Sequence, residues 1–274
     1  MLLHEHLENG ADKNPNFPFS EFEGNSLSYQ EANLLSNQLA NKLVSEGLEV
    51  GDRFAFLAKN CTEMAIMYYA ASKVGAVPVP LNYRLADQEW AYIINDSEAK
   101  LIIVKGNEYS DRINQISSEL KNVKKYISIS LDNSIQKFQD FYDWLSDSSN
   151  EKPTLKIHEN DDVYQMYTSG TTGHPKGAVL LQRNVAANIR QYLNSLTLPR
   201  PSRTLLVAPM YHAAAMINMC GCIAIGGTIV IQEDFIPQDV VDCLANEKIT
   251  HTVLVPAMIQ ACLVSVPNVA NNEY

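Results

Sequence analysis

The segment YTSGTTGHPKG, residues 167–177, contains three glycines, four Ser or Thr hydroxyls, one proline and one lysine. It follows the strand-like DVYQM, and a Gly-rich turn after a strand exposes successive backbone N–H groups that can bind an anion. Hydroxyls donate hydrogen bonds to phosphate oxygens, glycines let the backbone approach closely, and Lys176 supplies a mobile positive charge. We interpret this segment as a phosphate-binding loop rather than as a flexible loop with an exposed lysine.

The loop differs from the Walker motif, which requires glycine directly before its lysine, because Pro175 precedes Lys176 here. The residues that we expect to contact phosphate are Thr168, Ser169, Gly170, Thr171, Thr172, Gly173 and Lys176. This donor set predicts binding of a polyphosphate without a Walker fold.

Strand and helix patterns alternate around the loop. The strand-like 53–60, the apolar helix 62–73, a stop at Gly75 and the strand-like AVPV make a βαβ unit, which predicts a parallel sheet. Further strands are predicted at 100–104, 125–129, 163–167, 203–208, 228–231 and 250–255. Further helices are predicted near 87–96, 108–121, 138–146, 182–195, 213–224, 237–246 and 256–264, with a polar loop at 147–153. We therefore expect an α/β fold of two layered parallel-sheet units.

Composition excludes some classes of function. The 274 residues carry 31 acidic and 21 basic side chains, a net charge of −10, which disfavours binding to nucleic acid or to an anionic membrane. The start of the chain lacks a basic region followed by an apolar run, so we expect a cytoplasmic protein. The uncharged run 213–231 approaches the length of a membrane span, but its glycines, Asn218 and β-branched tail favour a buried helix, a turn and a buried strand.

The cysteines and most histidines show no metal-binding pattern. The five cysteines lie in apolar surroundings and fit reduced thiols used as small hydrophobic residues. His4 and His6 form an HEH sequence that we expect to be exposed, and His251 lies in an apolar strand. We favour non-ligating roles for these three histidines.

The loop resembles the signature of the adenylate-forming enzymes, which include acyl- and aryl-CoA synthetases, nonribosomal peptide adenylation domains and firefly luciferase. Three other segments resemble further motifs of that family: LSYQEANLLSNQLANKL (27–43), SKVGAVPVPLNYRLADQEWAYIINDSEAKLII (72–103) and LLVAPMYHAAAM (205–216). The resemblance extends over essentially the whole chain. Within that family, the segment PLNYRL is most similar to the corresponding segment of fatty-acyl-CoA ligases.

This resemblance implies a two-step reaction with ATP, Mg²⁺ and CoA. A carboxylate attacks the α-phosphorus of ATP to give an acyl-adenylate and pyrophosphate, and a thiol then displaces AMP. By motif position, Lys176 and Thr168 are the expected catalytic residues, and Thr168 is the expected hydroxyl near Mg²⁺. The implied partners are therefore ATP, a carboxylic acid and CoA, and a homodimer stays open.

His212 matches the family's aromatic position at the mouth of the acyl pocket. We favour a role in the pocket over a core histidine at a strand end. An amino-acid adenylation domain is disfavoured, because that subfamily places an aspartate near this motif and none occurs between Pro209 and Gly227.

The sequence shows none of the family's later motifs. These are an adenine-stacking Tyr-Gly-x-Thr-Glu block with a magnesium carboxylate, a ribose-binding aspartate, a hinge and a C-terminal domain with a catalytic lysine. We therefore expect a partial N-terminal domain, with interleaved subdomains at about 55–195 and at 1–54 plus 196–274, and without the C-terminal lid domain. By itself this chain is expected to be inactive, and a non-catalytic protein that binds nucleotide or a partner is the alternative.

Overall fold

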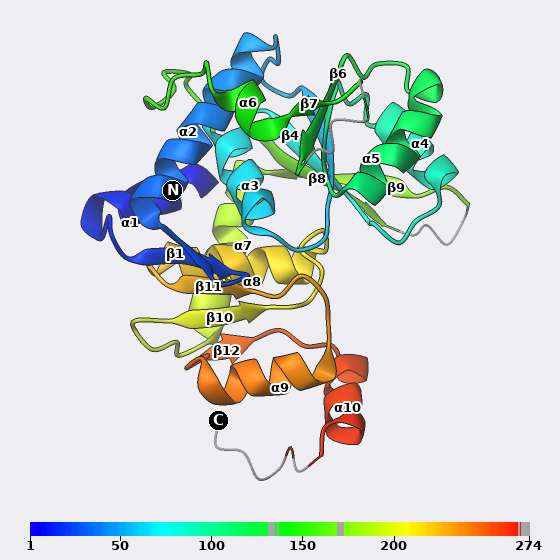
Figure 1. Cartoon of the computed structure of the whole chain (residues 1–274). Coiled ribbons are helices and arrows are strands. Elements are labelled where there is room, and N and C mark those ends of the chain that lie inside the picture. The colour runs from blue at the N-terminus through cyan, green and yellow to red at the C-terminus, as the bar shows by residue number, and fades with distance from the viewer. Residues whose placement is uncertain (131–134, 136, 169–172, 268, 270–274) are drawn as a thin grey trace.

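The computed structural model describes residues 1–130, 135, 137–168, 173–267 and 269, and it contains two five-stranded sheets and a two-stranded hairpin (Figure 1). The first sheet has the order β4-β3-β5-β6-β7, and its paired strands are parallel. Its strands are β3 (Arg53–Leu57), β4 (Val77–Leu81), β5 (Leu101–Lys105), β6 (Lys125–Ile129) and β7 (Gln139–Asp140). This sheet is the predicted parallel α/β unit.

Helices connect consecutive strands of the first sheet from β3 to β6. They are α3 (Thr62–Val74), α4 (Asp87–Asp96) and α5 (Asn107–Ile116), and the short α6 (Phe141–Leu145) follows β7, the last strand of this sheet. Every residue of α3 except Thr62 is buried, which explains its nearly continuous apolar sequence. The helix ends at Gly75, whose φ of 72° is a left-handed conformation that favours glycine.

The second sheet has the order β12-β10-β11-β1-β2, and only the β1–β2 pair is antiparallel. Its strands are β1 (Pro18–Phe22), β2 (Asn25–Ser28), β10 (Arg203–Leu206), β11 (Thr228–Ile231) and β12 (His251–Thr252). The helices α8 (Ala213–Ala224), α9 (Pro237–Asn246) and α10 (Pro256–Ser265) follow the strands β10, β11 and β12. The run 213–231 is therefore a helix, a turn and a strand, as predicted.

One hydrophobic core joins the two sheets. It includes Phe54 and Phe56 of the first sheet and Phe19 and Ile229 of the second. The helix α3 bridges the sheets, because its Tyr69 ring contacts the Phe19 ring of β1 edge-on, with ring centroids 6.0 Å apart. The N-terminal helices α1 (Leu3–Lys13) and α2 (Tyr29–Ser45) pack against α3.

Several elements differ from the sequence predictions. The helix α1 and the strands β1 and β2 were not predicted, nor was the strand β9 (Lys176–Leu181), which pairs antiparallel with β8 (Asp162–Thr168).

The expectation that His4 and His6 are exposed is wrong. His4 is 8% exposed and contacts the Ser72 hydroxyl through Nδ1 at 3.0 Å, because α1 packs on α3. Burial also lowers the pKa of His6 to about 4.

The described part of the chain contains no helix that is long and apolar enough to span a lipid bilayer. All five cysteines are free and buried, as the sequence predicted. Burial raises the pKa of the Cys220 thiol to about 12, so this group stays protonated at neutral pH.

Candidate functional site

The predicted phosphate loop connects β8 to β9 and continues neither parallel sheet. Thr168, the last residue of β8, lies directly opposite Lys176, the first residue of β9. Opposed residues of an antiparallel pair project to the same face, so the hydroxyl and the ammonium group flank one side of the loop. Both residues are exposed. Ser169, Gly170, Thr171 and Thr172, which complete the predicted contact set, lie outside the described residues.

At two positions of the loop the structure requires glycine, for a different reason at each. Gly173 has a φ of +122°, a region that residues with a side chain rarely adopt, and no atom of a described residue lies within 4 Å of the position that a Cβ would take. Gly177 has no room for a Cβ, because the Gln165 amide and the Tyr167 ring occupy that space. The glycines therefore allow a tight loop at one point and close packing of the hairpin at the other.

Side chains of α4 fix the ends of the loop. The Tyr167 hydroxyl donates to Asp96 Oδ2 at 2.6 Å, and the Tyr92 hydroxyl donates to the Pro175 carbonyl at 3.3 Å. The His174 ring stacks on the Tyr92 ring with centroids 4.7 Å apart and planes inclined by 20°. Tyr92 and Asp96 carried no signal in the sequence, because their role arises from a tertiary contact about 80 residues away along the chain.

Lys176 is available to bind an anion. Its ammonium group makes no hydrogen bond or ion pair with any residue in the described part of the chain. By contrast, the ammonium groups of Lys59 and Lys100 contact carboxylates. An unpaired ammonium beside a hydroxyl and a Gly-rich turn has the donor types that a triphosphate requires. The phosphate-binding role of Lys176 stays a prediction from the sequence.

His212 lies in a second cluster, on the loop between β10 and α8. It is the N-cap residue of α8, and its ring lies against the Tyr211 ring with centroids 4.3 Å apart. Tyr211 in turn contacts Tyr83 edge-on at 5.6 Å, and the Arg84 guanidinium lies 5.4 Å from the centre of the Tyr83 ring. Burial and the positive charge of Arg84 lower the pKa of His212, so its imidazole is neutral at neutral pH.

This aromatic cluster forms where strands of both sheets end. Tyr83 and Arg84 follow the carboxyl end of β4, and Tyr211 and His212 follow the carboxyl end of β10. In open α/β sheets, ligands bind outside the carboxyl ends of the strands. Tyr83 and Arg84 belong to the PLNYRL segment, where the sequence supplied a family resemblance but no individual role.

Asn60 holds the loops that carry this cluster. Its side chain is buried, accepts a hydrogen bond from the Met210 backbone N–H at 2.8 Å, and donates to the carbonyls of Ala208 and Gln232, each at 3.1 Å. Asn60 thereby connects the end of β3 to the segments after β10 and β11. Sequence reasoning did not identify this residue.

The described residues contain no group of three or more His, Cys, Asp or Glu side chains that could hold a metal ion. The proposed contribution of Thr168 to a magnesium site rests on the types and positions of the loop residues. Its exposed hydroxyl lies opposite Lys176 in the hairpin.

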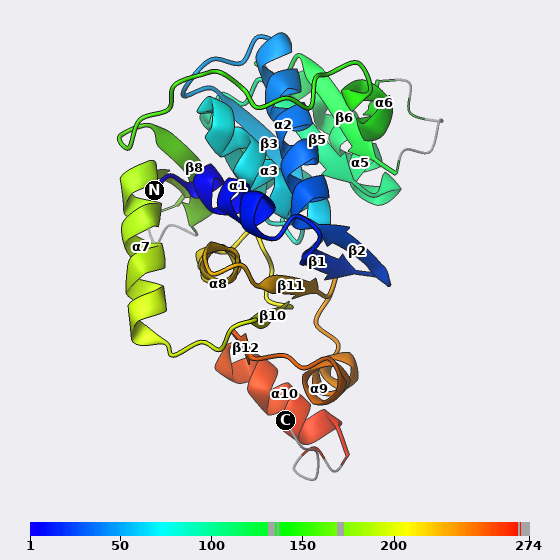
Figure 2. The same ribbon diagram turned by 90° about the vertical axis from the view of Figure 1, so that its left-hand side faces the viewer.

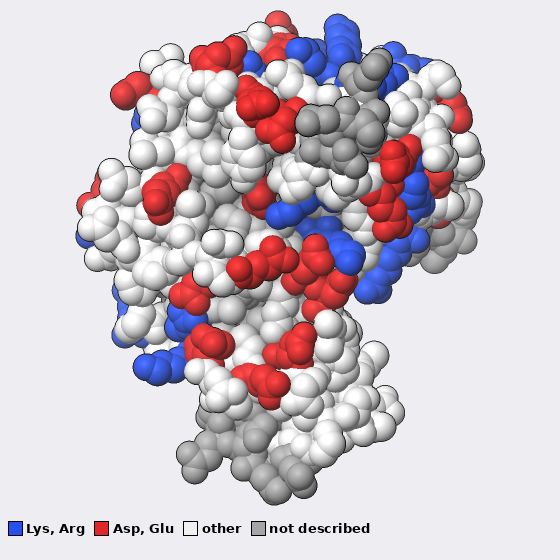
Figure 3. All heavy atoms as spheres, viewed as in Figure 1, with Lys and Arg blue, Asp and Glu red and all other residues white. Residues whose placement is uncertain are grey.

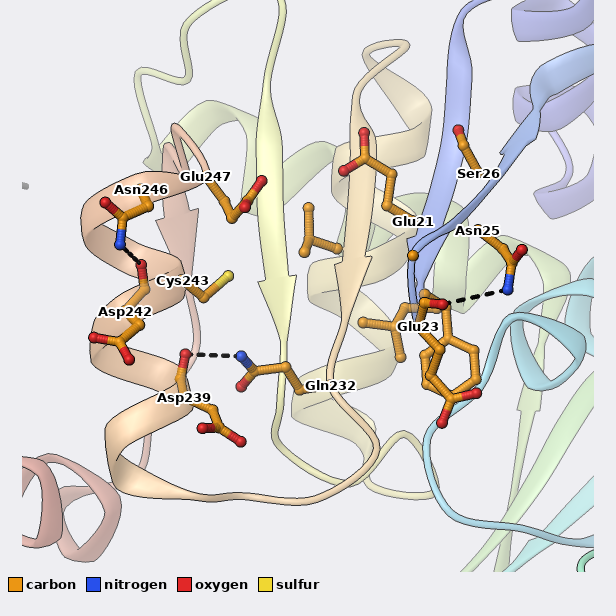
Figure 4. Close-up of a pocket in the computed structure, with 14 residues that line it drawn as sticks. Glu21, Glu23, Asn25, Ser26, Gln232, Asp239, Asp242, Cys243, Asn246 and Glu247 are labelled. Carbon is orange, nitrogen blue, oxygen red and sulfur yellow. Dashed lines mark hydrogen bonds between the residues drawn. The ribbon is translucent and has the colours of Figure 1, made fainter.

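A second concave region is acidic and does not suit phosphate. Acidic side chains gather on one face between the β1–β2 hairpin and α9 (Figure 3). They line a cavity of about 540 Å³ (Figure 4), and its carboxylates are Glu21, Glu23, Asp239, Asp242 and Glu247. Arg203 pairs with Glu21 through two contacts of 2.8 Å, which leaves the cavity with an excess of negative charge. A polyphosphate would be repelled here.

The sequence is similar to those of known AMP-binding enzymes. Residues 7–274 match the model of the AMP-binding enzyme family. The chain is 30% identical over 235 residues to long-chain-fatty-acid–CoA ligase FadD13 of Mycobacterium tuberculosis, and 30% identical over 239 residues to feruloyl-CoA synthase of an Amycolatopsis species. These matches cover 85% and 87% of this chain but 45% of each relative, so the chain spans about half the length of the curated relatives that it matches.

Solved structures share the fold. The N-terminal domain of FACL13 from M. tuberculosis, solved with a bound inhibitor, superposes with a TM-score of 0.88 at 27% identity, over 99% of this chain and 67% of that one. An anthranilate CoA ligase in complex with anthranoyl-AMP gives a TM-score of 0.92 at 20% identity, which supports the fold alone. The α/β fold, the hairpin loop and the match over nearly the whole chain establish that this protein belongs to the AMP-binding enzyme family.

Proposed function

We propose that this chain is the N-terminal part of an ATP-dependent acid–thiol ligase that activates a carboxylic acid as its adenylate and transfers the acyl group to CoA. The observation that carries the proposal is the β8–β9 hairpin, in which Thr168 and Lys176 flank a Gly-rich loop that the sequence shares with this family. The substrate class that we favour is a fatty acid, on the resemblance of PLNYRL and on the relative FadD13. The relative named as a feruloyl-CoA synthase makes an aromatic acid the second candidate.

In the first step, a carboxylate oxygen forms a bond to the α-phosphorus while the bond from that phosphorus to the bridging oxygen of pyrophosphate breaks. The leaving pyrophosphate takes the electron pair of that bond. No general base is needed, because the carboxylic acid is already ionised at neutral pH. The chain's contribution is to hold the phosphates and to stabilise the negative charge that moves onto pyrophosphate.

Lys176 and Thr168 are positioned for that contribution. The Lys176 ammonium can follow the outer phosphates because its stem is flexible, and the Thr168 hydroxyl can donate to a phosphate oxygen. Mg²⁺, when bound with ATP, would neutralise further phosphate charge. Gly173 allows the turn of the loop backbone, and the contacts of Tyr92 and Asp96 limit the movement of the loop ends.

In the second step, the sulfur of CoA forms a bond to the acyl carbon, the bond from that carbon to the phosphate oxygen of AMP breaks, and AMP leaves with the electron pair. The thiol proton passes to solvent. We assign His212 to the wall of the acid-binding pocket, where a neutral imidazole can contact the reacting carboxylate without forming an ion pair with it. The rings of Tyr211 and Tyr83 extend this wall toward Arg84.

We also propose that the domain is built from two interleaved subdomains, about 55–195 and 1–54 plus 196–274. The separate strand orders of the two sheets support this division. The helix α2 packs on α3 of the first sheet, so the subdomains share an interface rather than a flexible linker.

The proposal is tested by calorimetric titration of ATP–Mg²⁺ into the purified chain and into a Lys176→Ala, Thr172→Ala variant. The matched control is Lys156→Ala, which removes an exposed lysine outside the loop. We expect ATP binding that the double variant loses and the control retains. Equal affinities in all three proteins would contradict the phosphate-binding role.

A further inference from the structure

A cavity of about 570 Å³ lies where the C-terminal ends of α1 and α8 approach each other and the segment before β10. Figure 2 shows α1 lying across α8. The volume falls within the range of about 300–1,000 Å³ that is usual for small-molecule sites. The cavity is remote from the phosphate loop in sequence, and nothing in the proposed reaction uses it.

The charged side chains of this cavity have one sign. Lys13 of α1 and Arg200 of the segment before β10 line it, and none of the described residues that line it is acidic. Neither side chain forms an ion pair with a described residue. This contrasts with the chain's net charge of −10 and with the acidic cavity between β2 and α9. Two cations facing one cavity without a carboxylate leave its charge uncompensated.

Helix ends offset part of this charge but not all of it. The C-terminal ends of α1 and α8 each present a partial negative charge of roughly one half. Lys13 lies in the last turn of α1, where a cation is common for this reason alone. Arg200 lies outside any helix. The two side-chain cations, together with the α-amino group of Met1, which also lines the cavity, exceed the two half charges of the helix ends.

The rest of the lining is apolar or neutral. Ile223, Ile225 and Phe17 provide apolar surface, and Asn9 and Asn14 provide amide groups. His6 also lines the cavity. Because burial lowers its pKa to about 4, His6 is uncharged at neutral pH and can exchange hydrogen bonds without adding charge. A ligand that fits must therefore combine an apolar body with an anionic group.

We propose that this cavity binds a small amphipathic organic anion, with its acid group between Lys13 and Arg200 and its apolar body against the end of α8. A carboxylate and a phosphate monoester share this chemistry. The site differs from the proposed acid pocket, because His212 caps the opposite end of α8, a helix of 12 residues and hence about 18 Å long.

The test uses the full 274-residue chain and nuclear magnetic resonance of its histidine rings. Sodium octanoate is the carboxylate probe, octyl phosphate is the phosphate probe, and inorganic phosphate and 1-octanol separate the charge from the apolar body. We expect both amphipathic anions to shift the His6 ring signals in a saturable way, and the two control ligands to bind at least about tenfold more weakly, because each lacks one of the two interactions.

Variants assign the effect to the two cations. Lys13→Gln, Arg200→Gln should raise the Kd measured at His6 about tenfold or more, since it removes charge-assisted contacts. The matched control Lys156→Gln, Arg190→Gln removes one lysine and one arginine elsewhere and should leave Kd unchanged. The charge-conserving Lys13→Arg, Arg200→Lys variant should retain binding, which separates loss of charge from misfolding.

Unmoved His6 signals at millimolar octanoate and octyl phosphate, or equal Kd values in the wild type and the Gln variant, would overturn the proposal. His212 signals are recorded in the same spectra. A shift at His212 alone would support the proposed acid pocket and refute this cavity, whereas a shift at His6 alone would do the reverse.

Discussion

Lys73 gives a quantitative test of the packing of the N-terminal helices. It lies in α3 and is 3% exposed, and its ammonium group donates to Asn33 Oδ1 and Asn37 Oδ1, each at 2.6 Å, and contacts Glu8 Oε1 at 3.4 Å. These contacts join α3 to α1 and α2. Burial lowers the pKa of Lys73 from 10.5 to about 8, although the nearby Glu8 carboxylate acts in the opposite direction.

The sign of the pH effect follows from proton binding. Between pH 8 and pH 10.5 the unfolded chain holds a proton on this lysine that the folded chain has mostly lost. The contribution of Lys73 to the free energy of unfolding therefore rises with pH across this window. At pH 7 both states are protonated, and at pH 9 the folded lysine is largely neutral. The expected gain from pH 7 to pH 9 is about 1.3 kcal/mol.

The pH dependence of the free energy of unfolding of the wild type alone does not isolate the contribution of Lys73. Burial raises the pKa of cysteines such as Cys220 and Cys222 to about 12, and these thiols lower the stability as pH passes 9, because the unfolded thiols then lose protons first. The measurement is thus the difference between the wild type and Lys73→Met, since both proteins share the cysteines. Urea unfolding at pH 7 and pH 9 gives the free energy of unfolding for each protein.

The wild type should gain about 1.3 kcal/mol relative to Lys73→Met over these two pH units. The control is Lys156→Met, which removes an exposed lysine outside this group of contacts and should show the wild-type pH dependence. Parallel pH dependences for the wild type and Lys73→Met would refute the buried position of this lysine.

Lys176→Ala should weaken ATP binding by about 10- to 150-fold in calorimetry, the equivalent of one charge-assisted contact of about 1.5–3 kcal/mol, and an unchanged affinity would exclude a phosphate contact. Asn60→Ala should lower the free energy of unfolding by about 2–3 kcal/mol in urea titration, because it leaves the buried Met210 N–H without its acceptor; a loss below about 0.5 kcal/mol would count against this bond. Arg84→Met should raise the pKa of His212 in a histidine-ring titration, because a nearby positive charge is removed, and an unchanged pKa would separate the two residues.

Sequence patterns were most informative where a segment is apolar and self-contained. The helices α4, α7 (Gln182–Ser195), α8 and α9 and the strands β6 and β11 begin and end where they were predicted. Each has a continuous apolar run or a helical apolar stripe bounded by polar or Gly residues. Such signals depend on neighbouring residues only, so they survive in any tertiary context.

The missed elements depend on distant partners. The strand β9 follows a Gly-rich loop and is largely exposed, so its sequence KGAVLL shows no buried-strand pattern. It is a strand because β8 supplies its hydrogen bonds. The helix α1 carries Gly10 in its interior, which disfavours a helix, and it is stabilised by burial of Leu3 and Leu7 in the shared core.

The candidate site divides in the same way. The loop residues were recognisable because hydroxyl, glycine and lysine chemistry is concentrated in one segment. Tyr92, Asp96 and Asn60 were not, because each acts through hydrogen bonds to residues far away in the chain. Hydrogen bonds between residues that are distant in the chain are visible in the folded structure, but no local sequence pattern predicts them.

The position of the phosphate loop follows from its place outside the parallel sheets. The strand β8 packs beside β4 but belongs to a separate hairpin, so no continuous backbone ladder ties the loop to the His212 cluster. Side chains connect the loop to β3 and to α4 instead. Arg53 of β3 donates to Gln165 Oε1 at 3.3 Å, the Gln165 amide donates to the Tyr167 hydroxyl at 3.1 Å, and Tyr167 donates to Asp96. Because this chain of hydrogen bonds is broken by a change at any member, the geometry of the loop depends on residues that never contact a phosphate.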